Sequence, residues 1–176
     1  MEVKIKKLHE NSVIPTYAKN GDVGMDLTAV SLDIDRETGI MTYDTGLAFE
    51  IPNGYFGMVA LRSSVYKYNL DLTNKIGIID SGYRSSVKFK FELSLPFIDF
   101  AYDDVTFDDL LKKGEALYYP EEYNAHWKVP HSAPVYKIGD RVGQLIILPY
   151  PSIEFIEVDT LTESERGENG YGHTGN

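Results

Sequence analysis

Apolar and polar positions alternate along several short stretches of this chain, and helical spacing is scarce. Residues 87–93 place apolar side chains at the odd positions and charged side chains at the even ones. Residues 3–8 show a weaker form of the same alternation. A period of two residues is typical of a strand with one face buried, so we expect strands at both places.

Two further patterns extend this prediction. Residues 145–148 form a continuous apolar run that ends at Pro149, which predicts a strand buried on both faces. Apolar stretches at 47–51 and 56–61 flank Pro52-Asn53-Gly54, a sequence typical of a tight turn. Many short strands with regular turn signals favour an all-β fold: a sandwich, a jelly roll or a barrel.

The segment 96–134 differs from the rest of the chain because it is acidic and aromatic. Its eight acidic residues face only three lysines, so it contributes -5 to the net charge of -10. Within it, 106–114 predicts one short helix, with Thr106 as the cap and Gly114 as the stop. The segment reads either as a solvated surface excursion or as an interaction surface anchored by its aromatic residues.

The amino-acid composition excludes several classes of protein. With 176 residues, 43% of them hydrophobic and 25% charged, we expect a single globular domain over 1–176. The excess of 27 acidic over 17 basic residues argues against binding to nucleic acid or anionic membranes. The chain has no cysteine, no apolar run long enough to span a membrane and no apolar N-terminal signal segment, so we expect a soluble, cytoplasmic protein.

The arginines indicate where the chemistry lies. Four of the five stand within two positions of serine or glycine: Arg62, Arg84, Arg141 and Arg166. A guanidinium binds phosphate oxygens in a fork, and small neighbours let backbone amides approach, so this placement suits a polyphosphate ligand. Glycines crowd the last residues, and we expect 164–176 to be a flexible arm unless a ligand orders it.

Five segments in order resemble the signature motifs of the homotrimeric dUTPases (deoxyuridine triphosphate nucleotidohydrolases). They are Gly21–Leu27, Arg62–Ser64, Asn74–Arg84, Gly139–Gln144 and Arg166–Gly175. The resemblance implies a jelly-roll subunit, a trimer whose active sites are shared between subunits, and hydrolysis of dUTP to dUMP and pyrophosphate. The long segment 96–134 resembles the insert of dUTPases from phages of Gram-positive bacteria, some of which also bind host or mobile-element regulator proteins.

The third motif would supply the reacting group and the nucleoside site. By this resemblance, Asp80 is the general base that activates the attacking water, held at a strand end where it is rigid and partly desolvated. Asn74 and the backbone near Gly77 and Ile79 would meet the uracil edge, and Tyr83 would lie under the deoxyribose and exclude a ribose. Arg84 would point away from the substrate.

The first, second and fourth motifs would hold the phosphates. Arg62, Ser63, Ser64 and Gln144 are expected to contact them, with Arg141 in support of the site. Asp26 is expected to hold Mg²⁺ through coordinated water, since magnesium retains several waters.

The arm would close over the bound substrate. By resemblance its contacts come from Arg166, Gly170, Tyr171, Gly172, His173 and Thr174. Tyr171 stands where phenylalanine is usual and keeps the stacking face for uracil, whereas His173 replaces the usual serine.

Three other functions stay open at this point. A dCTP deaminase would share the fold and the class of nucleotide, although Asp80 and the glycine-rich arm resemble the hydrolase. A non-catalytic phage module that presents 96–134 to a partner is the second alternative. A jelly-roll lectin or structural protein is the third, and it leaves the placement of the arginines unexplained.

Overall fold

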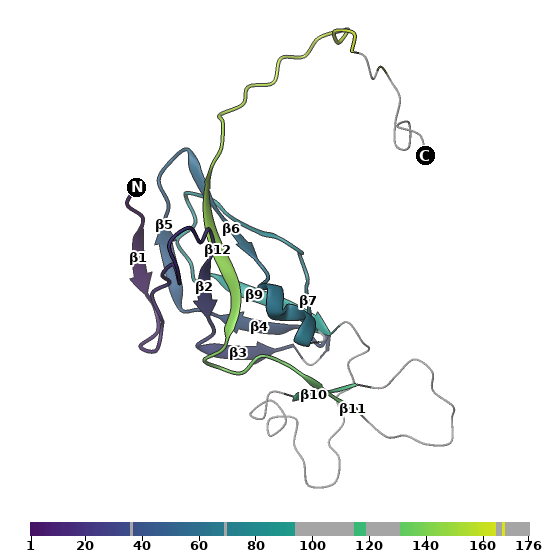
Figure 1. Ribbon diagram of the computed structural model, residues 1–176. Coiled ribbons are helices and arrows are strands. Elements are labelled where there is room, and N and C mark those ends of the chain that lie inside the picture. The colour runs from purple at the N-terminus through teal and green to yellow at the C-terminus, as the bar shows by residue number, and fades with distance from the viewer. Residues whose placement is uncertain (36, 69, 94–114, 119–130, 165–166, 168–176) are drawn as a thin grey trace, which may run out of the picture.

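Two four-stranded antiparallel sheets form the body of the protein. The computed structural model describes residues 1–35, 37–68, 70–93, 115–118, 131–164 and 167. One sheet has the strand order β2-β12-β6-β8 and the other β3-β4-β9-β7 (Figure 1). The predicted all-β class is confirmed: the described part of the chain holds only one helical element, the short 3₁₀ helix η1 (Ser63–Lys67).

The strands are short, as the turn signals predicted. In chain order they are β1 (Lys4–Lys7), β2 (Met25–Thr28), β3 (Ser31–Ile34), β4 (Met41–Asp44), β5 (Leu47–Glu50), β6 (Tyr55–Ala60), β7 (Leu70–Leu72), β8 (Gly77–Ile79), β9 (Lys88–Leu93), β10 (Glu115–Tyr118), β11 (His131–Pro134) and β12 (Arg141–Pro149).

Strand β9 confirms the clearest prediction from the sequence. Phe89 and Phe91 are fully buried, while the charged residues between them face solvent. The predicted turn at Pro52-Asn53-Gly54 also forms: Tyr55 N donates to Pro52 O at 3.2 Å, and Gly54 has a φ of +82°. This turn connects strands of different sheets, because β5 pairs with β1 while β6 pairs with β12 and β8.

Strand β12 lies between β2 and β6, and one prediction about it is wrong. Residues 145–148 were expected to be buried on both faces, yet only Leu145 is buried and the next three residues are half-buried. Side chains alternate between the faces of a strand, and one face of β12 packs on the core through Leu145 and Ile147. The opposite face of this sheet is only partly covered by the chain's own residues.

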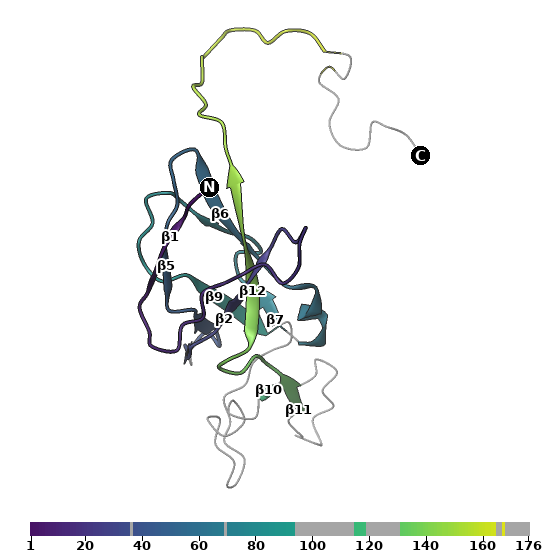
Figure 2. The same cartoon turned by 60° about the vertical axis from the view of Figure 1, so that its left-hand side comes forward.

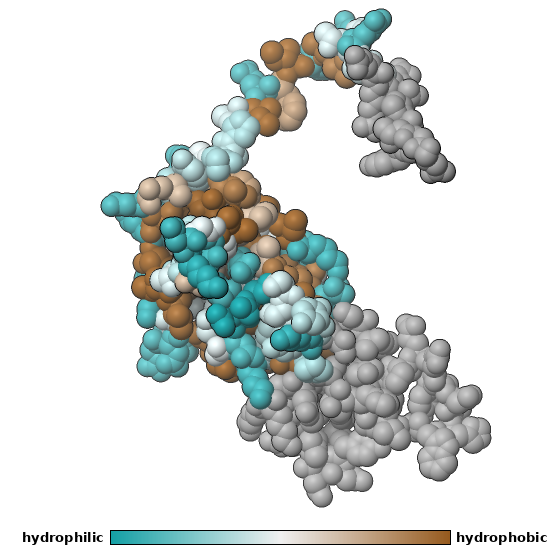
Figure 3. Space-filling model, viewed as in Figure 1, coloured by the Kyte–Doolittle hydropathy of each residue, from teal (hydrophilic) through white to brown (hydrophobic). Residues whose placement is uncertain are grey.

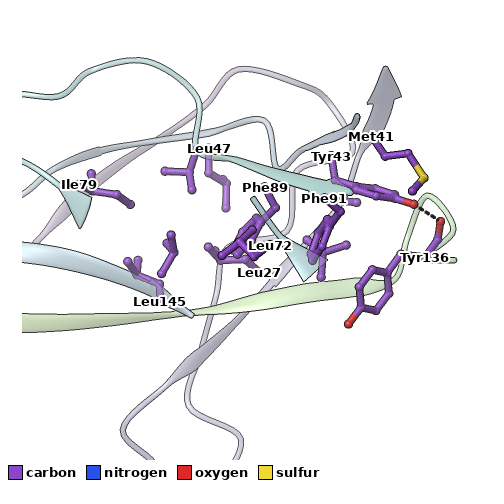
Figure 4. Packing of buried hydrophobic residues seen from close by; sticks show 14 of the residues in the cluster. Leu27, Met41, Tyr43, Leu47, Leu72, Ile79, Phe89, Phe91, Tyr136 and Leu145 are labelled. Carbon is purple, nitrogen blue, oxygen red and sulfur yellow. Dashed lines mark hydrogen bonds between the residues drawn. The ribbon is translucent and has the colours of Figure 1, made fainter. Parts of the chain in front are cut away.

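Aromatic side chains fill one end of the core. Tyr43 contacts Phe91 edge-on at 5.7 Å between ring centroids and Tyr136 at 6.0 Å. The Tyr43 hydroxyl donates to Tyr136 O at 2.8 Å, which ties β4 to the segment that precedes β12 (Figure 4). Edge-to-face pairs of this kind add to the stabilisation from burial alone.

Residues 96–134 are described only in part. Strands β10 and β11 pair antiparallel, with Glu115 opposite Pro134 and Tyr118 opposite His131. The helix expected at 106–114 lies outside the described residues. None of the helical structure that is described is long and apolar enough to cross a membrane.

After β12 the chain leaves the body as an extended segment. Figures 1 and 2 show residues 151–164 running away from the sheets in both views. Hydrophobic side chains lie along this segment (Figure 3), among them Phe155 at 92% exposure and Leu161 at 83%. Most of the predicted arm 164–176 lies outside the described residues.

Candidate active site

Asp26 is the centre of a charged cluster on strand β2. Its Oδ1 accepts hydrogen bonds from Arg62 Nε at 2.8 Å and from Gln144 Nε2 at 3.3 Å, and its Oδ2 accepts one from Arg141 Nη1 at 3.0 Å. Arg62 Nη1 also donates to Ser64 Oγ at 3.3 Å. Two guanidinium groups around one carboxylate leave a net positive charge, which suits an anionic ligand.

The sheet explains why these residues meet. Gln144 on β12 lies directly opposite Asp26 on β2, and the register is irregular between Arg141 and Gly143, so Arg141 and Gln144 both reach Asp26. Arg62 is the N-cap of η1 and reaches Asp26 from the end of β6. The structure therefore joins candidate residues from the first, second and fourth motifs.

An open cavity of about 270 Å³ lies beside this cluster. Its lining residues are Thr16, Ala18, Asp22, Val23, Gly24, Asp26 and Gln144. A Cβ at Gly24 would lie 3.0 Å from Gln144 Oε1, so glycine leaves room for the Gln144 side chain. Asp22 and Val23 belong to the first motif, which predicts no role for them, and no sequence pattern indicates Thr16.

A second cavity, of about 200 Å³, lies along the turn before β8. Asn74, Gly77, Ile79 and Tyr83 line it, which are the four residues expected at the nucleoside. A Cβ at Gly77 would collide with Val59 Cγ2, so this strand needs glycine to pack against β6. Lys75 has a φ of +57°, and Ile76 N donates to Asn74 O, which shows how tight the turn is.

Tyr83 is fixed by two hydrogen bonds at the end of this cavity. Its hydroxyl donates to Ser86 O at 3.1 Å, and its backbone N–H donates to Asp80 O at 3.0 Å. Arg84 donates to Ser81 O at 2.6 Å and to Tyr83 O at 2.9 Å, so its guanidinium stabilises this turn. Neither of the cavities described so far has Arg84 among its lining residues.

Asp80 follows β8 directly and lines a third cavity, of about 380 Å³. Phe56, Ile78, Ser81 and Tyr150 line it as well. The expected partial desolvation of Asp80 is not provided by the subunit: the side chain is exposed, because β8 is an edge strand beside an open surface. Phe56 and Tyr150 contact each other at 6.4 Å between ring centroids and were not identified from the sequence.

The Asp26 cluster and Asp80 lie at opposite edges of one sheet. Its strand order is β2-β12-β6-β8, so β2 and β8 are three strand spacings apart. With about 4.8 Å between neighbouring strands, this separation is roughly 14 Å. Asp80 therefore makes no direct contact with the Asp26 cluster of its own subunit. The six candidate residues of the arm, from Arg166 to Thr174, lie outside the described residues.

The sequence of this chain is similar to those of known enzymes. The family model for dUTPase matches residues 10–93. The deoxyuridine 5'-triphosphate nucleotidohydrolase of Solibacter usitatus is 30% identical over 99% of this chain and 97% of its own length. The enzyme of the same name from Helicobacter hepaticus is 33% identical over 99% of this chain and 89% of its own length.

Solved structures of phage enzymes share the fold. The dUTPase of Staphylococcus bacteriophage 80alpha with dUPNHPP has a TM-score of 0.68 and 24% identity, covering 99% of this chain and 98% of that one. A mutant from phage 80alpha, described in work on enzymatic activity and SaPI inducing capacity, has a TM-score of 0.67 and 24% identity over 97% of both chains. A mutant dUTPase from phage phi11 of S. aureus, described with a structural Mg(II) ion, has a TM-score of 0.63 and 19% identity over 91% of this chain and 98% of that one.

The two packed antiparallel sheets and the curated relatives define a jelly-roll enzyme of nucleotide hydrolysis. This chain belongs to the dUTPase family, and its activity is that of a dUTP diphosphatase.

Proposed function

We propose that this protein cleaves dUTP at the α-phosphorus with a water activated by Asp80, in sites completed by neighbouring subunits. The observation that carries the proposal is the position of Asp80. It directly follows β8, whose residues Gly77 and Ile79 line the cavity for the nucleoside. A base at that point can orient a water toward the first phosphate of a nucleotide whose base lies along the turn.

The nucleoside would be selected by shape and by backbone hydrogen bonds. Asn74 and the backbone around Gly77 and Ile79 would pair with the uracil edge. Gly77 lets β8 pack closely against β6, because a Cβ at Gly77 would collide with Val59 Cγ2. Tyr83, held by Ser86 O, would lie against the deoxyribose and collide with a ribose hydroxyl.

The phosphates would be held by the cluster around Asp26. Arg62, Ser63, Ser64 and Gln144 would donate to phosphate oxygens, and the charge they supply would stabilise the leaving pyrophosphate. Asp26 would orient Arg62 without occupying all of its guanidinium nitrogens, because only Nε of Arg62 donates to Asp26.

The side chains around Asp26 could hold Mg²⁺ only through metal-bound water. The described residues contain no group of three or more acidic or histidine side chains that could bind a metal directly. Asp26 already accepts three hydrogen bonds, and a carboxylate has about four acceptor positions, which leaves room for one metal-bound water. When bound, magnesium would neutralise charge on the phosphates.

A homotrimer with shared sites would bring the two halves together. Within one subunit, β2 and β8 are roughly 14 Å apart, so the two groups of residues do not meet. In a trimer, the nucleoside cavity of one subunit would lie beside the Asp26 cluster of another. The exposed apolar segment after β12 would pack on a neighbouring copy. The arm 164–176 would then cover the substrate through Arg166, Gly170, Tyr171, Gly172, His173 and Thr174.

A substrate panel tests this function directly. With Mg²⁺ present, dUTP should be converted to dUMP and pyrophosphate, whereas dTTP, dCTP and UTP should be hydrolysed at least a hundredfold more slowly. Asp80→Asn should lower kcat by at least a hundredfold with little change in KM, because the base acts only in the transition state.

Asp33→Asn is the matched control, because Asp33 is an exposed acid on β3 in the other sheet. It should keep full activity. Equal turnover of all four nucleotides, or full activity of Asp80→Asn, contradicts the mechanism. Release of ammonia from dCTP would instead support the deaminase alternative.

A second function, binding of a regulatory protein through residues 96–134, rests on composition. This segment carries a net charge of -5 and eight aromatic residues. A related phage enzyme was described for SaPI inducing capacity. Deletion of residues 97–127 should leave dUTP hydrolysis intact and abolish binding to a regulator of the host or of a mobile element. Unchanged binding after the deletion would rule out this segment as the main determinant.

A further inference from the structure

Tyr136 lies in the core at a point where several aromatic rings converge. Its exposure is 1%, its ring contacts Phe91 at 5.6 Å between centroids, and its carbonyl accepts the Tyr43 hydroxyl at 2.8 Å (Figure 4). Tyr136 precedes the turn at Gly139 that leads into β12. Its position is therefore fixed by β4 and β9 on one side and by the start of β12 on the other.

Tyr68 packs on the remaining side of this ring. The Tyr68 and Tyr136 ring centroids are 4.1 Å apart with an interplanar angle of 37°. Tyr68 is the C-cap of η1, and its backbone N–H donates to Val65 O at 2.8 Å. The contact thus connects the end of η1 to the rigid core.

The other end of η1 carries the candidate phosphate ligands. Arg62 is the N-cap and is bonded to Asp26, and Ser63 and Ser64 are the first residues of the helix. A 3₁₀ helix of five residues has too few internal hydrogen bonds to hold its own position, so its two ends need outside contacts. Arg62 provides one of these contacts and Tyr68 the other.

The ring of Tyr136, rather than its hydroxyl, makes the contact with η1. Among the described residues, the buried Tyr136 hydroxyl has no hydrogen-bond partner. Burial and the neighbouring Tyr68 raise the pKa of Tyr136 to about 12, with the Arg62 guanidinium acting in the opposite direction. The side chain therefore stays neutral and acts by packing.

We infer that the tilted ring pair Tyr68–Tyr136 positions Arg62, Ser63 and Ser64 for the substrate phosphates. The inference rests on the proposed phosphate site and adds two positioning residues that lie outside the five motifs. Neither tyrosine needs to touch the substrate. They act by fixing the distance and direction of η1 relative to Asp26.

The test compares three substitutions on one short helix. Tyr68→Leu removes the ring that packs on Tyr136, Tyr68→Phe keeps it, and Tyr66→Leu removes a ring that is 80% exposed on the same helix. KM and kcat for dUTP are measured together with inhibition by pyrophosphate and by deoxyuridine. Pyrophosphate probes the phosphate side alone, and deoxyuridine probes the nucleoside side alone.

Tyr68→Leu should weaken inhibition by pyrophosphate roughly three- to tenfold and raise KM for dUTP in proportion, because an aromatic pair contributes about that factor. Inhibition by deoxyuridine should stay unchanged, and the other two variants should behave like the parent. Unchanged pyrophosphate inhibition in Tyr68→Leu overturns the inference. Equal weakening of both inhibitors also overturns it, because this would mean a general loss of structure.

Two further variants keep the outcome decisive. Tyr68→Met fills the space without a ring and replaces Tyr68→Leu if that variant does not fold. Arg62→Gln must weaken pyrophosphate inhibition if the phosphate site lies at Arg62. If Arg62→Gln has this effect and the Tyr68 variants do not, only the role of the tyrosine pair fails; if Arg62→Gln has no effect, the proposed phosphate site itself fails.

Discussion

At the scale of single residues, Asp26 shows how far a residue's neighbours can differ from what its sequence context indicates. The first motif predicts an acid that holds Mg²⁺ through coordinated water, and the structure surrounds this acid with three side-chain partners. Those partners are 36, 115 and 118 positions away along the chain. No local pattern encodes such contacts, because the pairing of β2 with β12 brings Arg141 and Gln144 to Asp26, and Arg62 arrives from the end of β6.

Two tyrosines in the core differ in whether the buried hydroxyl makes a hydrogen bond. Tyr43→Phe removes a buried hydrogen bond to Tyr136 O and should lower the free energy of unfolding by about 1–2 kcal/mol. Tyr136→Phe removes a buried hydroxyl that has no partner among the described residues, so stability should stay within about 0.5 kcal/mol of the parent or rise.

Urea denaturation of both variants at one fixed protein concentration measures these differences. Parent-like m-values would show that neither substitution changes the surface exposed on unfolding. A Tyr136→Phe variant that loses as much stability as Tyr43→Phe would contradict the assignment of the unpaired hydroxyl.

At the scale of elements, strands were predictable and the one described helix was not. Strand β9 follows from a period of two residues, since its buried phenylalanines alternate with charged residues. Helix η1 buries none of its residues and shows no apolar periodicity. Its position comes from contacts at its two ends, Arg62 with Asp26 and Tyr68 with Tyr136, which sequence spacing does not reveal.

The pair of strands β4 and β9 should show a measurable dependence on pH. Asp44 and Lys88 are opposite one another in the register and are 3.4 Å apart between Oδ2 and Nζ. Burial raises the pKa of the Asp44 carboxyl, but hydrogen bonds from Ser86 and Gly46 N and the Lys88 ammonium outweigh it and hold the pKa below its ordinary value.

Because the pKa of Asp44 is lower in the folded state, its contribution is complete above the unfolded-state pKa of about 4 and is lost as the pH falls through the folded-state value. Asp44→Asn should therefore be less stable than the parent near pH 7, and this difference should shrink as the pH falls below about 4. Unfolding free energies measured between pH 3 and pH 7 check this. Asp33→Asn on the adjacent β3 is the control and should show no such trend. If Asp44→Asn loses the same stability at every pH, the stabilising role of the charged Asp44 carboxylate is contradicted.

At the scale of the whole molecule, one subunit keeps the two groups of candidate residues apart. The cavity of Asn74, Gly77 and Tyr83 lies at the β8 edge of the sheet, and the Asp26 cluster lies at the β2 edge. Motif order predicts the members of both groups, since it follows the chain. It could not place the groups in space, because their separation depends on strand order.

The same scale explains the wrong prediction about residues 145–148 and the exposure of Asp80. A continuous apolar run predicts burial without saying which chain supplies the cover. In the single subunit Ile146 and Leu148 stay half-buried, and the segment after β12 exposes Phe155. Packing between copies would bury such surfaces and desolvate Asp80, which is consistent with the proposed trimer.

The most direct test of the account is whether two inactive variants restore each other's activity. Asp80→Asn and Arg62→Gln are unfolded together, refolded as a one-to-one mixture, and assayed for dUTP hydrolysis beside each variant refolded alone. If Asp80 of one subunit works with Arg62 of another, random assembly gives an intact pair in about a quarter of the sites, so about a quarter of the parent activity should return. Mixed assemblies with no more activity than the separate variants would contradict the shared site.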